Sequence, residues 1–421
     1  MITPIVVVAV AIAYLALASL SSALAFVAAD AWTVWLASGL VLGLLLACRR
    51  DKWAAILGGA ALGAAAFSFL LGDLSIIDAV GYAAIEVSTA LAGAFVFVWL
   101  APTPTRLESA RELSALFAAA LVLALLGAAL AAAWSLAAGS DPAMRTFRVW
   151  MIANVVGTIL VAPLVITWSG FRPKRSGGLT MTEFIAGAVV CVLFFGTLQL
   201  VFGASADARL GGVGGKGPTY LPIMFMALLA LLWGARGATL VAFAATLLAL
   251  FHTLHGRGPF ADIGGLLGDP ELEVQGYTAA MALTGLLVAG LEAAQRNAMR
   301  TARDWRTRFE AAIGAHRLIA YEWDPVGGGF VITGDTRALL GVPAESIRTL
   351  ADWLAHVAPD ERDLVASAFA MRADGGAVAP LAYRMTLPDR GIVELSDEAQ
   401  AIRDHDGSLH RITGIVRIAA A

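Results

Sequence analysis

The chain has 421 residues, of which 59% are hydrophobic and 14% are charged, and its formal net charge is −3. Soluble domains usually carry about 25% charged residues, so much of this chain is expected to lie in a membrane. The sequence has no basic footprint of the kind that nucleic-acid-binding proteins show, so nucleic acid is excluded as a partner. The two cysteines, Cys48 and Cys191, lie in or beside apolar runs and are expected to be reduced packing residues.

The composition changes near residue 293. Residues 1–292 hold 14 Lys/Arg and 15 Asp/Glu, whereas residues 293–421 hold 15 and 17 in less than half the length. The first part has the composition of a membrane domain and the second that of a soluble domain. We therefore predict a membrane domain at 1–293, a linker helix at 294–316 and a soluble domain at 317–421.

Apolar runs divide the first part into membrane segments. A helix needs about 20 apolar residues to cross the hydrocarbon core of a bilayer. The runs and their breakers give up to ten segments, at roughly 5–27, 32–48, 53–71, 77–100, 113–138, 148–169, 183–203, 219–234, 237–256 and 275–293. The second and eighth are short, so either is expected to be a half-span covered by neighbouring helices.

The loops between the segments predict their orientation. Loops after even-numbered segments, including 49–52 and 171–175, hold 14 basic residues when the stretch from Glu292 to Arg308 is added. Loops after odd-numbered segments hold five. Because basic residues concentrate on the cytoplasmic side of a membrane, both termini are predicted to be cytoplasmic.

Four polar residues lie within the apolar segments: Glu86, Asn154, Gln199 and His252. A polar group in lipid is costly, so these side chains are expected to face a polar interior. One interpretation is a cavity that senses a ligand or an ion, and the other is hydrogen bonding between helices with Glu86 protonated. His252 and His255 are three residues apart without a local carboxylate or cysteine, so no metal site is predicted.

The junction between the two parts is expected to be one helix, because no proline occurs from Glu271 to Asp324. Small and apolar residues recur along it at alternating spacings of four and three, at Leu287, Leu291, Ala294, Ala298, Thr301, Trp305, Phe309 and Ala312. This weak heptad pattern indicates a dimeric signalling helix, and the alternative is a solvated helix on a monomer. The arginines nearest the membrane are expected to contact anionic lipid headgroups.

The soluble part alternates short strands and helices. Strands are predicted at 317–324 and 329–334, short helices at 336–342 and 350–357, and a longer helix from Pro359, with Asp360 and Glu361 in its first turn. Three further strands follow, separated by turns rich in Asp and Gly. This order predicts an antiparallel α+β sheet with helices across one face.

Three stretches of the first part resemble the first class of membrane-associated sensor (MASE) domain. They are WTVWLASGLVLGLLLACRRDKWAAILGGA (32–60), VWMIANVVGTILVAPLVITW (149–168) and YLPIMFMALLALLWGARGATLVAFAATLLALFHTLHGRGPF (220–260). The resemblance implies a bacterial sensory input of about eight spans, of the kind that precedes histidine kinase, diguanylate cyclase and phosphodiesterase modules. The family often has proline before a Ser/Ala-Gly pair, and this chain instead has Leu36 and Ala37.

The second part resembles a PAS domain of the subtype with a tryptophan before the long helix, here Trp353 followed by APDER at 358–362. The family binds haem, flavin, small metabolites or nothing. This region has no cysteine for flavin photochemistry, and residues 359–373 have no histidine to bind haem, although His356 lies just before them. We predict no cofactor and leave the PAS ligand unknown; apolar side chains are expected to fill the pocket.

The predicted fold class is thus a polytopic α-helical membrane domain of about 8–10 spans, followed by a cytoplasmic α+β PAS domain. The predicted function is a homodimeric sensor in the bacterial inner membrane, the input part of a histidine kinase or a cyclic-di-GMP enzyme. The sequence has no catalytic motif, so the output is expected from a downstream kinase or cyclase module or a partner membrane protein. The alternatives are a transporter or channel with a regulatory PAS domain, and a PAS domain that is merely anchored to the membrane.

Overall fold

A computed structural model describes residues 2–25, 33–72, 74–139, 142–170, 180–203, 217–260, 270–374, 379–387, 391–403 and 409–418. The basic loop predicted at 171–175 lies outside these residues. The chain forms two compact units, Met1–Asn297 and Ala298–Ala421. Each unit is described separately.

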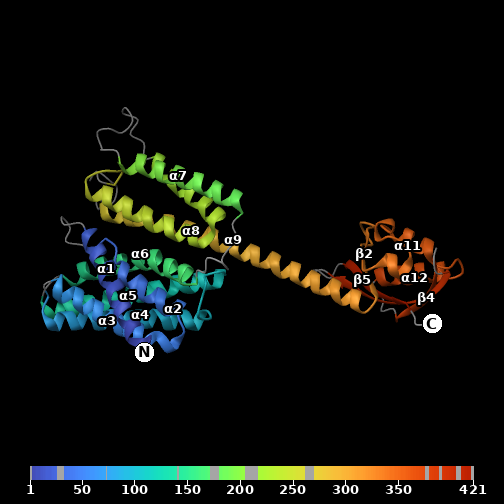
Figure 1. Ribbon diagram of the computed structural model, residues 1–421, viewed down its shortest axis with the longest axis horizontal. Helices are drawn as coiled ribbons and strands as arrows, with labels where there is room; N and C mark the ends of the chain where they lie inside the picture. Colours follow the sequence, from blue (N-terminus) through green and yellow to red (C-terminus); the bar gives the residue numbers. More distant parts are fainter. Residues whose placement is uncertain are drawn as a thin grey trace. The chain divides into compact units, whose positions relative to one another are not determined.

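The first unit is a helical bundle (Figure 1). Its helices are α1 (Ile2–Ala23), α2 (Leu36–Ala47), α3 (Trp53–Leu70), α4 (Ile76–Leu100), α5 (Ala110–Ala138), α6 (Ala143–Ser169), α7 (Met181–Gly203), α8 (Leu221–Leu254) and α9 (Pro270–Ala315), with short 3-10 turns at Arg50–Lys52 and Gly217–Tyr220. Among the described residues, eight helices are long and apolar enough to cross a membrane, and α2 is the shorter apolar helix.

Helix α8 consists of two segments that meet at Gly234, where φ is 63° and ψ is −163°. A Cβ atom placed on Gly285 would lie 3.2 Å from Met226 Cγ and 3.5 Å from Ala238 Cβ. A straight helix would separate those two residues by about 18 Å, so the chain folds back at Gly234. The two segments predicted at 219–234 and 237–256 are therefore distinct, and glycine at the break allows the positive φ.

Helix α2 is a half-span enclosed by the bundle, as predicted for the second segment. Ten of its 12 residues are buried. The free N–H groups at its beginning are satisfied by other helices, because the Trp35 N–H donates to the Ala153 carbonyl at 3.0 Å and the Leu36 N–H donates to Ser21 Oγ at 3.0 Å. A helix end inside a membrane protein needs such partners, since lipid offers none.

Glycines bring α2 and α6 into backbone contact. A Cβ atom on Gly39 would lie 2.5 Å from the Gly157 carbonyl oxygen, and one on Gly157 would overlap the Trp35 carbonyl group. A Cβ atom on Gly43 would lie 3.0 Å from the Ala162 backbone. Small residues at such crossings let helices pack closely where no hydrophobic force drives them together.

Helix α9 is unbroken over 46 residues, from Pro270 to Ala315, as the absence of internal proline predicts. Its first turns pack into the first unit, where Val274 and Met281 are fully buried. Its last turn packs in the second unit through the buried side chain of Ile313. The helix ends at Ala315, and Arg317, whose φ of 53° is left-handed, precedes the first strand directly.

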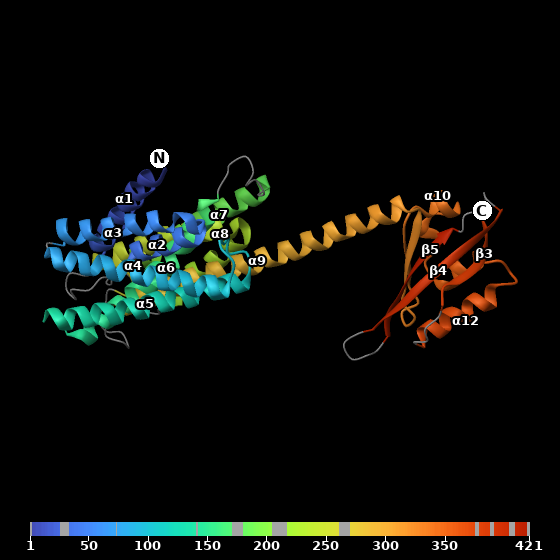
Figure 2. The same ribbon diagram turned by 90° about the horizontal axis from the view of Figure 1, so that it is seen from below.

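The second unit is an antiparallel five-stranded sheet in the order β2-β1-β5-β4-β3 (Figure 2). Its strands are β1 (Leu318–Trp323), β2 (Phe330–Thr333), β3 (Leu381–Leu387), β4 (Gly391–Arg403) and β5 (Leu409–Ile418), and its helices are α10 (Thr336–Leu340), α11 (Leu350–His356) and α12 (Arg362–Ala373), with a 3-10 turn at Ala344–Ser346. The five strands and the helices between them match the predicted α+β order.

The predicted beginning of the long helix at Pro359 was wrong. Helix α12 begins at Arg362, and Glu361 is its N-cap residue. The local pattern placed Asp360 and Glu361 in the first turn, but both carboxylates instead bind Arg384 of β3. The Arg384 backbone N–H and Nε donate to Glu361, and its Nη2 donates to Asp360. The backbone hydrogen bond, then the side-chain one, holds the pKa of Glu361 below its ordinary value.

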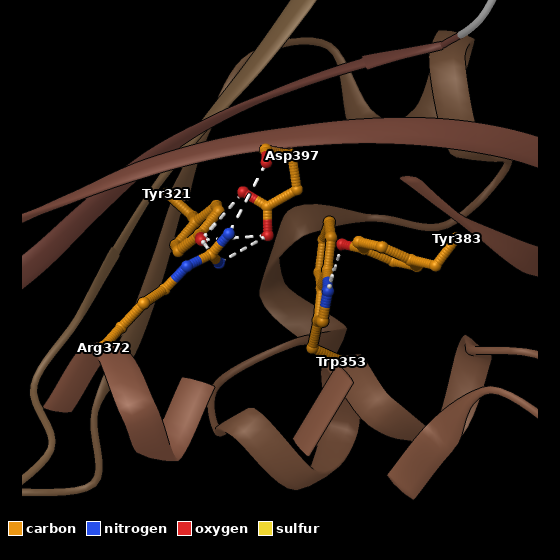
Figure 3. Close-up of polar contacts among 5 residues, drawn as sticks. All are labelled: Tyr321, Trp353, Arg372, Tyr383 and Asp397. Atoms are coloured by element: carbon orange, nitrogen blue, oxygen red, sulfur yellow. Dashed lines mark hydrogen bonds and ion pairs between the residues drawn. The ribbon is translucent and has the colours of Figure 1, made fainter. Parts of the chain in front are cut away.

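The interior of the second unit contains a buried ion pair (Figure 3). Arg372 of α12 and Asp397 of β4 are 2% and 0% exposed, and Arg372 Nη1 lies 2.8 Å from Asp397 Oδ2. The Tyr321 hydroxyl of β1 donates to the same carboxylate at 3.0 Å, and Trp353 Nε1 donates to the Tyr383 hydroxyl at 3.0 Å. Burial raises the pKa of Asp397, and the hydrogen bonds from Arg372 and Tyr321 oppose this shift.

We expect Gly157→Ala to destabilise the bundle by about 1–3 kcal/mol, because the added methyl group overlaps the backbone at Trp35. The measurement is the thermal unfolding of the detergent-purified chain. Gly58→Ala is the matched control, since a Cβ atom there meets nothing within 4 Å, and it should leave the midpoint unchanged or slightly raised. Equal midpoints for the two variants would contradict the close α2–α6 packing.

We expect Arg372→Met to destabilise the second unit by about 3–5 kcal/mol, because it leaves the Asp397 carboxylate buried without its cation. The double variant Arg372→Met with Asp397→Leu removes both charges and should recover most of the loss. Hydrogen exchange of the β4 and β5 amides in the full chain measures both effects. Exchange as slow in the single variant as in the unaltered protein would show that the pair is unimportant.

Candidate functional site

Glu86 and Asn154, two of the four polar residues singled out in the sequence, line one cavity of about 260 Å³. Glu86 comes from α4 and Asn154 from α6. Water occupies about 30 Å³ per molecule in the liquid, so the cavity has room for a small organic molecule. The Asn154 side chain donates to the Trp150 carbonyl one turn earlier at 2.8 Å, which fixes its orientation at the cavity wall.

The Glu86 carboxyl group is the buried acid of this cavity, and its residue is 4% exposed. Its polar neighbours are the side chains of Trp35 and Tyr14, which both interact with it. Oε1 of Glu86 has no hydrogen-bond partner among the described residues. A buried carboxyl oxygen without a partner is costly, so this atom is expected to be satisfied by something that enters the cavity.

Aromatic rings form much of the cavity wall. The five aromatic side chains that line it are Tyr14, Trp35, Phe67, Tyr82 and Trp150. Trp35 and Phe67 meet edge to face with centroids 5.5 Å apart, and Tyr82 stacks on Trp150 at 5.6 Å. These pairs fix the rings in place, so the cavity has a defined shape.

The cavity opens where α3 and α5 end and where α4 and α6 begin. Gly72, Leu74, Ser135 and Arg145 line this mouth. Glu86 lies ten residues into α4, about 15 Å along the helix from its beginning. The acid is therefore deep in the bundle, whereas the cationic residue Arg145 is exposed at the mouth.

Gln199 and His252 lie together at a different place, between α7 and α8. His252 Nε2 lies 3.0 Å from Gln199 Oε1, and His252 Nδ1 has no hydrogen-bond partner among the described residues. His255 instead contacts its own helix, with Nδ1 2.7 Å from the Phe251 carbonyl oxygen. The four candidates thus form two pairs, and this second pair ties two helices together.

The relay residues predicted on α9 lie on an exposed face. Leu291 is 68% exposed and Trp305 is 70% exposed, and Ala294, Ala298 and Phe309 are exposed as well. The opposite face packs into the bundle only in the first part of α9, up to Gly290, whereas every residue from Ala298 to Ala312 is exposed. Near the beginning of α9, Gln275 Nε2 donates to the Thr33 carbonyl at 2.6 Å, and Thr33 lies two residues before Trp35 of the cavity.

In the described part of the chain, no group of three or more His, Cys, Asp or Glu side chains is placed to hold a metal ion. In the second unit, Tyr321, Phe330, Trp353 and Phe369 pack ring against ring beside the Arg372 ion pair. His356, at the end of α11, is half-buried.

Sequence reasoning missed the aromatic part of the cavity. Tyr14, Tyr82 and Trp150 lie in apolar segments where large rings are ordinary, so nothing in the local pattern distinguishes them. Trp35 belongs to a stretch that carries the family resemblance, but only the packing of α2 against α4 and α6 places it beside Glu86. A search for tryptophan near the ends of the apolar segments would have found Trp35 and Trp150, each of which is among the first four residues of a predicted segment.

Solved structures similar to this chain match only a small part of it. The N-terminal domain of a diguanylate cyclase with PAS/PAC sensor from Marinobacter aquaeolei is 22% identical, with 24% of this chain and 94% of that chain covered and a TM-score of 0.23. A sensory box histidine kinase/response regulator from Burkholderia thailandensis is 17% identical, with 27% and 84% covered and a TM-score of 0.23. No curated protein matches the chain.

Two family models match successive parts of the chain. The MASE1 family matches residues 5–296, which is the whole helical bundle with the beginning of α9. The PAS fold matches residues 331–416, which covers the sheet from β2 onwards. Together with the apolar helices and the antiparallel sheet, these matches establish a multi-pass membrane protein with an appended PAS domain. The chain belongs to the MASE1 family of membrane sensor domains and carries a PAS domain after it.

Proposed function

We propose that this protein is a sensor of the bacterial inner membrane, with both termini in the cytoplasm, and that it forms the input part of a histidine kinase or a cyclic-di-GMP enzyme. The observation that carries the proposal is the continuity of α9, which begins inside the MASE1 bundle and ends at β1 of the PAS sheet. A helix without a break transmits a rotation or a shift from one end to the other.

Contacts at the beginning of α9 support this relay. The segment from Thr33 to Trp35 borders the Glu86 cavity at one end and accepts the Gln275 hydrogen bond at the other. A ligand that changes the position of Trp35 therefore acts on a backbone segment that α9 holds directly. The stimulus must favour one of two arrangements of these groups, because a ligand that binds both equally shifts nothing.

The exposed face of α9 supports a homodimer. The residues at alternating spacings of four and three, from Leu287 to Phe309, are all exposed, and from Ala298 to Ala312 every side of the helix is exposed. Two such helices side by side bury these residues against each other. Arg296 and Arg306, which lie between these positions in the sequence, are paired with Glu292 and Glu310 on the same helix.

We expect Ala298→Cys to form a disulfide-linked dimer in membranes when the natural cysteines at 48 and 191 are replaced by alanine. Arg300→Cys is the control, because it lies about 200° around the helix from residue 298 and faces away from the predicted partner. The measurement is the fraction of cross-linked chain after mild oxidation. No dimer at residue 298, or equal cross-linking at both positions, would refute a dimer along this face.

Insertions after Ala298 test the relay when residues 1–421 are joined to a diguanylate cyclase domain and cellular cyclic-di-GMP is measured. One inserted alanine turns all later residues by about 100°, whereas seven inserted residues return them to within about 20° of their original direction. We expect the single insertion to change the output severalfold and the seven-residue insertion to preserve it.

The same experiment separates the proposal from its rival. If the single insertion, the seven-residue insertion and a proline at residue 298 all give the output of the unaltered fusion, α9 does not transmit a signal. The membrane domain would then be only an anchor for the PAS domain.

A further inference from the structure

We propose that the Glu86 cavity binds a small organic ammonium ion, with the positive nitrogen against Glu86 and the carbon substituents against the aromatic wall. The inference rests on the proposed sensor function, because it assigns the chemical class of the stimulus. It is derived from the side chains that line the cavity, taken in turn below.

The hydrogen-bond partners of the Glu86 carboxyl group indicate what kind of group the cavity would bind. The indole of Trp35 can only donate, and the Tyr14 hydroxyl is the other polar neighbour of the Glu86 carboxyl group. Oε1 of Glu86 is buried and has no hydrogen-bond partner among the described residues. What this atom lacks is a donor, and an ammonium N–H is a donor that also brings the compensating charge.

The walls of the cavity are rich in aromatic side chains. Tyr14, Trp35, Phe67, Tyr82 and Trp150 present aromatic rings to a cavity that also contains a buried acid. The faces of such rings attract cations, and indole attracts them most strongly. A buried carboxyl group within an aromatic enclosure recognises an ammonium ion and its alkyl substituents at once, whereas a neutral molecule of equal shape gains only the apolar part.

The charge of Arg145 must be compared with that of Glu86. Arg145 is the cationic residue in the lining, and it is exposed at the mouth. Water screens an exposed charge far more than a buried one, so Glu86 dominates the electrostatics of the deep end. The deep end thus favours a cation, and the screened charge of Arg145 opposes its entry only weakly.

The test uses two primary ammonium ions, each with a neutral analogue of nearly equal shape: 3,3-dimethylbutan-1-amine with 3,3-dimethylbutan-1-ol, and 2-phenylethylamine with 2-phenylethanol. Binding to the detergent-purified full chain is measured by tryptophan fluorescence, to which Trp35 and Trp150 contribute, and by thermal shift. We expect at least one ammonium ion to bind about tenfold or more tightly than its neutral analogue, because charge-assisted hydrogen bonds and cation–π contacts add to its affinity.

Three variants sharpen the result. Glu86→Gln keeps the shape of the side chain and should weaken ammonium binding at least about tenfold. Tyr82→Leu keeps the apolar bulk, removes one aromatic face and should weaken it about threefold. Glu108→Gln makes the same chemical change as Glu86→Gln in an exposed loop outside the cavity, and it should bind as the unaltered protein does.

The proposal is wrong if neither ammonium ion binds, if each neutral analogue binds as tightly as its partner, or if Glu86→Gln keeps full affinity for the ammonium ion. These outcomes are independent of the relay. Ammonium binding that depends on Glu86, in a protein whose fused output ignores insertions after Ala298, would support the binding site and refute the sensor function.

Discussion

The structure depends on the way the buried end of α2 is held. A helix that begins inside a membrane protein must have partners for its first N–H groups, because lipid supplies none. Here the Trp35 and Leu36 N–H groups bond to Ala153 of α6 and Ser21 of α1, and Gly157 leaves space for the backbone to approach. The few residues before α2 are thus fixed against two helices at once, and everything that borders them is fixed as well.

Two further contacts start from this same segment. The Trp35 side chain interacts with Glu86 of α4, and the Thr33 carbonyl accepts the Gln275 hydrogen bond from α9. The cavity and α9 therefore contact one short stretch of backbone. Coupling between two sites requires an element that both can bias, and this stretch has direct contacts with each. A half-span is well suited to such a role, because its end lies at the depth of the cavity and not at the membrane surface.

The sequence predicts those features that local patterns determine. Alternation and turn residues locate every strand of the PAS unit, and the Gly-Ala-Arg-Gly run marks the break at Gly234. Features that depend on which helices are neighbours are not predictable in this way. No local pattern shows that Glu86 and Asn154 share one cavity, or that Gln199 and His252 contact each other at another place. The beginning of α12 shows the same limit, since acidic residues near Pro359 suit a first turn, yet Arg384, more than 20 residues later, draws both carboxylates to β3.

The PAS interior determines what can follow from a movement of α9. The helix passes through Arg317 into β1, and β1 pairs with β2 and β5. Tyr321 of β1 also bonds to Asp397 of β4, which holds Arg372 of α12. A loosely packed interior would absorb a displacement of β1, but close-packed rings around a buried ion pair resist rearrangement and pass strain on. Under the proposed function, this arrangement favours a PAS domain that relays movement through its sheet and α12 over one that responds to a ligand in its interior.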